Sequence, residues 1–188
     1  MKSRLILFTG AVSLLVACSS PSSTPPDTRA LGDVTAEPRE CGLISSDAIK
    51  IATGLTEYSA YGTTIDMGRR FGSCSVGGEA EGEQGLLIKM FEPSPISPEG
   101  LENTKRVNRG NDLPNGLGPG FVARRGNAQG RSIAFVYGWT GDYEKLLTIN
   151  IMEGVPGRDS AADAVEFFRQ LRPVLLDERS GEEAVDVG

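Results

Sequence analysis

Residues 145–173, KLLTINIMEGVPGRDSAADAVEFFRQLRP, decide the fold class of this chain. Leu147, Ile149 and Ile151 alternate with polar residues, which is typical of a strand that buries one face. After a Gly/Pro turn, residues 160–172 form the clearest predicted helix, with a capping box at its start and a proline at its end. Its apolar residues share one face: Ala161, Ala164, Val165, Phe168 and Leu171. The strand and the helix are therefore expected to pack on each other.

The residues before this pair of elements predict further strands and two short helices. Strands are expected at residues 71–76, 86–91, 121–125, 132–139 and 145–152, separated by turns rich in Gly, Pro or acidic residues. The helices are expected from Ser45 or Ser46 to Gly54, and over residues 98–107. A run of strands closed by a helix predicts an α+β fold, with helices packed on one face of an antiparallel sheet. An all-β sandwich would leave the last helix unexplained.

The first 18 residues have the features of a bacterial lipoprotein signal. After a basic start, residues 5–16 form an uncharged apolar run that is too short for a bilayer, which needs about 20 residues. Leu15-Val16-Ala17-Cys18 then resembles a lipobox, in which the cysteine becomes the acylated N-terminus. Residues 1–17 are expected to be the signal peptide and Cys18 the lipidation site. An ordinary secretory signal cut near Ala17 is the alternative.

The expected anchor defines the location and the domain boundaries. An acylated Cys18 would hold the protein on the extracytoplasmic face of the cell membrane, because acyl chains contribute about 0.8 kcal/mol per buried CH₂. Residues 18–40 are rich in Ser, Pro and Thr and are expected to be a disordered tether. Residues 177–188 are expected to be a disordered acidic tail. The α+β domain would then span residues 41–176.

Composition narrows the chemistry. The 188 residues contain no His, which excludes Ser-His and Cys-His catalysis and His-metal sites. The chain has 19 basic and 25 acidic residues, and loss of a signal peptide with two basic residues would change the net charge from −6 to −8. A net negative charge argues against nucleic acid as a partner. We expect no catalytic residues, no metal and no cofactor.

Cys41 and Cys74 are the two cysteines that remain besides Cys18, the expected lipidation site. In an exported protein such a pair predicts a disulfide, because that compartment is oxidising. On the chain-entropy model, the bridge would stabilise the fold by roughly 3–4 kcal/mol. A reactive thiol pair is the alternative, although neither cysteine lies in a Cys-x-x-Cys motif.

The strongest candidate for a binding site is a basic stretch between residues 105 and 131. It has a local charge of +5, with Asp112 as its one acidic residue. Its basic residues are Lys105, Arg106, Arg109, Arg124, Arg125 and Arg131. They would attract the anionic groups of wall polymers, lipid headgroups or an acidic envelope protein. The alternative is a solvated face whose arginines pair with nearby acids.

Three other patterns are less specific. The glycines at 116, 118 and 120 depart from the dinucleotide fingerprint and predict a turn. Scattered carboxylates could support glycan hydrolysis without His, but their spacing selects no pair: Asp66, Glu92, Asp142, Glu144 and Glu153. Tyr137 is expected in the core. Trp139 belongs either to the core or, with Tyr143, to a ligand-binding aromatic patch.

Cys41-Gly42-Leu43-Ile44-Ser45, followed by a short helix, resembles the opening of a family of actinobacterial envelope lipoproteins, domain of unknown function 3558. The lipobox, the tether, residues 113–122 (LPNGLGPGFV) and the closing helix fit the same pattern. The chain departs from it at Val76, where an aromatic residue is frequent, and at Pro119-Gly120. The resemblance implies an α+β lipoprotein with Cys74 as the second cysteine, one disulfide and no assigned enzyme activity.

Together these features predict a non-enzymatic, membrane-anchored module that binds a protein or a cell-envelope component. Such a module should have a filled core and an exposed patch. A carrier of a lipid or small hydrophobic ligand is the alternative, and it should have a deep apolar cavity under the helix at residues 160–172. A carboxylate-based wall glycan hydrolase is a weaker alternative, and it should have two carboxylates that converge in a cleft.

Overall fold

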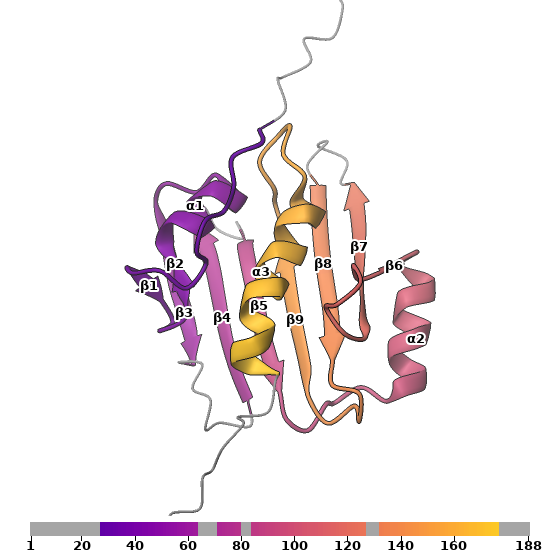
Figure 1. Ribbon diagram of the computed structural model, residues 1–188. Coiled ribbons are helices and arrows are strands. Elements are labelled where there is room, and N and C mark those ends of the chain that lie inside the picture. Colours follow the sequence, from indigo (N-terminus) through magenta and orange to yellow (C-terminus); the bar gives the residue numbers. More distant parts are fainter. Residues whose placement is uncertain (1–26, 64–70, 80–83, 127–131, 177–188) are drawn as a thin grey trace, which may run out of the picture.

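The computed structural model describes residues 27–63, 71–79, 84–126 and 132–176, which form nine strands and three helices (Figure 1). The strands are β1 (Arg39–Glu40), β2 (Ile44–Ser45), β3 (Tyr58–Thr63), β4 (Phe71–Gly78), β5 (Gln84–Phe91), β6 (Asn111–Asp112), β7 (Gly120–Gly126), β8 (Ser132–Trp139) and β9 (Leu146–Ile151). The helices are α1 (Ser46–Thr53), α2 (Pro98–Val107) and α3 (Ser160–Leu175).

Seven strands form one antiparallel sheet in the order β3-β4-β5-β9-β8-β7-β6, and β1 pairs with β2 beside it. The predicted α+β class and antiparallel sheet are confirmed. Strands β4, β5, β7, β8 and β9 match the predicted strands closely. The sequence pattern did not predict β3, because most of its residues are exposed and it has no apolar alternation.

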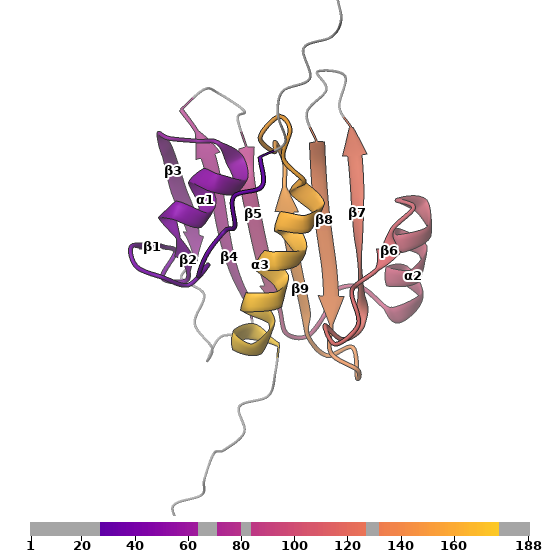
Figure 2. The same ribbon diagram turned by 45° about the horizontal axis from the view of Figure 1, so that its top comes forward.

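Helices α1 and α3 cover the same face of the sheet, as predicted (Figures 1 and 2). The side chains of Phe167, Phe168 and Leu171 in α3 are fully buried against this face. Gly138 of β8 lies directly below α3, where a Cβ would be 2.1 Å from the Phe168 ring. Helix α2 lies beside β7 and contributes the buried Leu101 to a cluster on the opposite face of the sheet.

The ends of α3 differ from the prediction. Asp159 caps the helix instead of Ser160, because its carboxylate accepts the N–H groups of Ala161 and Ala162 at 3.0 Å each. Pro173 lies inside the helix, which continues to Leu175. The proline removes only one main-chain donor, and the Leu176 N–H still reaches the carbonyl of Arg172 at 2.8 Å.

Residues 27–40, expected to belong to a disordered tether, pack on the domain instead. Leu31 and Val34 are 5% and 0% exposed and join the main core. The side chain of Gln170 in α3 accepts the Val34 N–H at 2.9 Å and donates to the Gly32 carbonyl at 2.8 Å. The predicted domain start at residue 41 is therefore wrong, since two isolated apolar residues dock this segment. We call residues 27–38 the strap; residues 18–26 lie outside the described residues.

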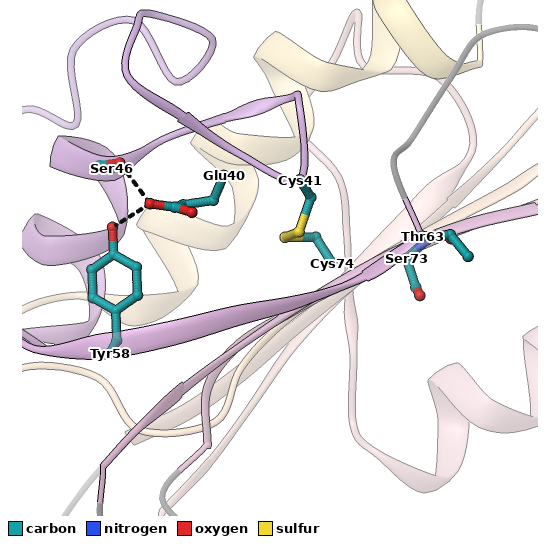
Figure 3. Close-up of a disulfide and its surroundings, with 7 residues drawn as sticks. All are labelled: Glu40, Cys41, Ser46, Tyr58, Thr63, Ser73 and Cys74. Carbon is teal, nitrogen blue, oxygen red and sulfur yellow. Dashed lines mark hydrogen bonds between the residues drawn. A yellow bond between two sulfur atoms is a disulfide. The ribbon is translucent and has the colours of Figure 1, made fainter.

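A disulfide joins Cys41 to Cys74 with a Cα–Cα distance of 5.8 Å (Figure 3), which confirms the predicted bridge. It links the β1–β2 turn to β4. Beside it, Glu40 accepts hydrogen bonds from the hydroxyls of Ser46 at 2.9 Å and Tyr58 at 3.1 Å. The disulfide and these contacts fix the end of the strap to the β3–β5 side of the sheet.

Candidate functional site

A groove with a volume of about 670 Å³ lies between the first two turns of α3, strand β7 and the segment that contains β6. Its floor is formed by small apolar side chains: Pro114, Val122, Ala161, Ala162 and Val165. The residues with charged side chains that line it are Arg109, Asp112, Arg124, Asp159 and Glu166. We call it the α3–β7 groove.

Strand alternation places Arg124 in this groove. Val122 and Arg124 lie opposite Val136 and Ala134 of β8, so their side chains lie on the face that α3 covers. Arg124 pairs with Asp159, the residue that caps α3. The two side chains are 53% and 56% exposed, so the pair contributes about 1 kcal/mol at most. Burial raises the pKa of Asp159, but the Ala162 N–H and the Arg124 guanidinium outweigh burial and lower it overall.

Arg109 enters the groove from the sharp turn after α2. Its φ of 53° is in the left-handed region, which allows the chain to leave the helix and enter β6. The next residue, Gly110, packs against Phe121, and a Cβ there would lie 2.6 Å from the ring. Within the described residues, the exposed guanidinium of Arg109 has no hydrogen-bond or ion-pair partner.

Every carboxylate that lines the groove has its own cation. Asp112 pairs with Lys105 at 2.5 Å, and Glu166 pairs with Arg169 at 2.6 Å. The Arg169 guanidinium lowers the pKa of Glu166, although burial opposes this shift. With Asp159 matched by Arg124, one positive charge is left over at Arg109 among the described residues.

The structure brings part of the predicted basic stretch together. Arg109 and Arg124 line the groove, and Lys105 is held at its edge by Asp112. The Arg125 guanidinium lies on the opposite face, 5.9 Å from the centre of the Phe135 ring, and donates to Asn108. The exposed Arg106 of α2 donates to Asn103 at 2.6 Å. Arg131 lies outside the described residues.

The aromatic patch expected as one possibility for Trp139 is a core cluster. Trp139 is 4% exposed and stacks on Tyr143 with 6.0 Å between ring centres. Tyr137 is half-buried and stacks on Phe121 at 5.2 Å. The predicted glycine turn is confirmed at Gly116 and Gly118, whose φ values are 90° and 76°, whereas Gly120 is the first residue of β7.

The sequence did not predict the residues that α3 contributes to the groove, or the buried ion pair behind it. Arg158 binds both oxygens of Asp163 at 2.6 and 2.7 Å, and Asp27 of the strap lies 3.4 Å from the same guanidinium. Burial raises the pKa of Asp163, and Arg158 opposes this shift. The sequence contained only one local signal for these residues: Asp159 stands directly before the predicted helix, where a capping residue is expected.

The features expected for the two alternative functions are not seen in the described part of the chain. The space under α3 is filled by its buried aromatic rings. The groove carboxylates are held by separate cations and not directed at one point. Asp142 accepts the Thr140 hydroxyl at 2.5 Å and the Glu144 N–H at 3.1 Å, which stabilises the β8–β9 turn. Asp66 lies outside the described residues.

In the described ranges, no helix is long and apolar enough to cross a membrane, and no group of three acidic or cysteine residues could hold a metal ion. The resemblance to the actinobacterial lipoprotein family stays a prediction. No family model, curated protein or solved structure matches the chain.

Proposed function

We propose that the chain is a membrane-anchored extracytoplasmic lipoprotein, acylated at Cys18, whose domain binds an acidic segment of an envelope protein in the α3–β7 groove. The observation that carries this proposal is an open apolar groove with one unmatched arginine, Arg109, among the described residues. A carboxylate would complete the charge balance of the groove, and an Arg–carboxylate pair adds directionality to binding.

The filled core favours protein binding over lipid transport. A carrier must bury an acyl chain, but Phe167, Phe168 and Leu171 occupy the space between α3 and the sheet. The groove instead has a shallow floor of small side chains with charged groups at its rim. This combination is typical of a site that accepts a polypeptide, whose own side chains fill the groove.

A photoreactive residue introduced in place of Val165 tests, in living cells of the source organism, whether a protein binds in the groove. Val165 lies in the groove, and Tyr61, which is 58% exposed on β3 at the opposite edge of the sheet, is the matched control. We expect one defined protein adduct from position 165 and none of the same mass from position 61. The additional change Arg109→Glu should remove the adduct. The same adducts from both positions, or adducts that survive Arg109→Glu, would contradict the proposal.

The anchor is tested separately with an alkyne fatty acid fed to growing cells. The wild-type protein should take up the label and sediment with membranes, and Cys18→Ala should lose both properties. A labelled Cys18→Ala protein would show that the acyl chain is attached elsewhere. Native mass spectrometry of the purified domain should show no bound lipid, and a stoichiometric lipid would favour the carrier instead.

A further inference from the structure

We infer that the bound segment adds a strand to the outer edge of β7, antiparallel to it and opposite residues 123–126. This inference rests on the proposed function and specifies how the same groove is used. In strand addition, main-chain hydrogen bonds hold the segment, and alternate side chains select it.

The outer edge of β7 is only partly covered. Strand β6 pairs with β7 through two residues, Asn111 opposite Val122 and Asp112 opposite Phe121. Beyond Val122, no strand in the described ranges pairs with this side of β7, although β8 pairs with all seven β7 residues on the other side. Four residues of β7, from Ala123 to Gly126, therefore have an open outer edge.

Two hydrogen bonds establish which residues of β7 direct their main-chain N–H and C=O groups to this edge. The Trp139 N–H of β8 donates to the Pro119 carbonyl at 3.1 Å, and the Leu113 N–H donates to the Gly120 carbonyl from the β6 side at 3.2 Å. The direction of the main-chain N–H and C=O groups alternates from residue to residue along an antiparallel strand. The main-chain groups of Val122, Arg124 and Gly126 therefore also point outward, like those of Gly120. Arg124 and Gly126 thus offer N–H and C=O groups to an added strand.

The side chains of an added strand would meet two different surfaces. A residue opposite Arg124 shares the face of α3 and contacts Val165 and Ala161 in the groove. Its neighbour, opposite Arg125, has its side chain on the other face of the sheet. An apolar or small residue fits the first position, and an acidic residue next to Arg125 fits the second.

Charge identifies the occupant as an acidic segment and not a second copy of this chain. Arg124 lies on one side of the open edge, Arg125 on the other, and Arg109 at its end. In an antiparallel pair of two β7 edges, these arginines would face each other, which disfavours pairing. A segment that runs in the direction of β6 ends beside Asn111, so a carboxylate near its C-terminal end meets Arg109.

A random dodecapeptide library on phage, selected against the purified domain alone, tests this binding mode, and the enriched peptides are then assayed against the Val165→Arg variant. We expect enriched peptides that alternate acidic and apolar residues. Proline at an outward-facing edge position removes one donor but leaves the β7–β8 pairing intact. Relative to the matched Arg124→Ala, which keeps the N–H, Arg124→Pro should weaken the best peptide by about a further tenfold.

Peptides methylated at single backbone nitrogens test the same bonds without altering the protein. Methylation should abolish binding at every second position and leave the positions between unaffected. Equal binding to Arg124→Pro and Arg124→Ala, or methylation effects without alternation, would overturn strand addition while the groove stays the binding site. No enrichment, or peptides indifferent to Val165→Arg, would overturn the proposed function as well. Light scattering should show a monomer, and a dimer dissociated by Arg124→Pro would identify a second copy as the occupant.

Discussion

The two halves of the sheet are stabilised in different ways. On the β3–β5 side, the disulfide, the strap and α1 hold the strands from outside the sheet, and Cys74 and Val34 are fully buried. On the β7 side, no described strand pairs with the outer edge beyond the two-residue β6, and charged side chains line the groove. The comparison indicates that the covalent cross-link and the strap lie in the first half, whereas the proposed binding surface lies in the second.

Breaking the buried ion pair between Arg158 and Asp163, behind the α3–β7 groove, should have the largest effect. Arg158→Leu leaves Asp163 buried without its guanidinium partner and should lower the free energy of unfolding by about 3–5 kcal/mol. Urea unfolding followed by tryptophan fluorescence measures this value. The double variant Arg158→Leu/Asp163→Leu should recover most of the loss, because no unpaired charge remains. Equal stability of the two variants would contradict the assigned role of the pair.

Removal of the disulfide should have the next largest effect. Cys41→Ser/Cys74→Ser opens a cross-link between residues 33 positions apart and should lower the free energy of unfolding by about 3 kcal/mol. Reducing agent should shift the thermal midpoint of the wild type and leave that of the double variant unchanged. If reducing agent shifted the thermal midpoint of both proteins, its effect would not be due to the Cys41–Cys74 disulfide.

The strap should contribute a smaller part of the stability. Val34→Ala removes buried methyl groups and should cost about 1–2 kcal/mol. Thr35→Ala, at the half-buried neighbouring position, is the matched control and should cost less, since it loses only a local hydrogen bond to Asp33. Urea midpoints give both values. If Val34→Ala did not change the urea midpoint, residues 27–38 would not unfold cooperatively with the rest of the domain.

Acid should weaken both halves moderately. Hydrogen bonds from Thr35 lower the pKa of Asp33 in the strap below its usual 3.8, and Asp159 in the groove is lowered as well. A carboxyl group whose pKa is lowered by folding stabilises the folded state at pH values above its usual pKa. This contribution is lost as the pH falls below that value. The thermal midpoint should stay constant between pH 7 and 5 and fall below about pH 4. Asp33→Asn should make this fall shallower, and an unchanged slope would contradict a role for Asp33.

Changes in the groove should have the smallest effect on stability. Arg109→Glu alters an exposed side chain without a described partner and should change the free energy of unfolding by less than about 0.5 kcal/mol. The same variant should lose the photoadduct at Val165. A large loss of stability would show that Arg109 supports the fold, and the proposed division between the two halves would then be wrong.

The sequence predicted what depends on local pattern. The alternation of Leu147, Ile149 and Ile151 and the apolar face of α3 were sufficient for the fold class, and the cysteine count was sufficient for the bridge. The groove depends on contacts between distant residues, such as Arg124 with Asp159, which no spacing rule predicts. The strap was missed because two apolar residues in a polar segment give no periodic signal.

The docking of Asp27 beside Arg158 would limit how far the domain could stand from a membrane if Cys18 is acylated as proposed. Eight residues lie between Cys18 and Asp27, and the nine Cα–Cα steps from one to the other span about 32 Å at most in a fully extended chain. A tether over all of residues 18–40 would allow more than twice this height. The Asp27 end of the molecule is also the end at which α3 begins (Figure 1), so an acylated Cys18 would keep the α3–β7 groove close to the lipid headgroups. The proteins within reach of the groove would then be those that lie in or directly next to the same membrane.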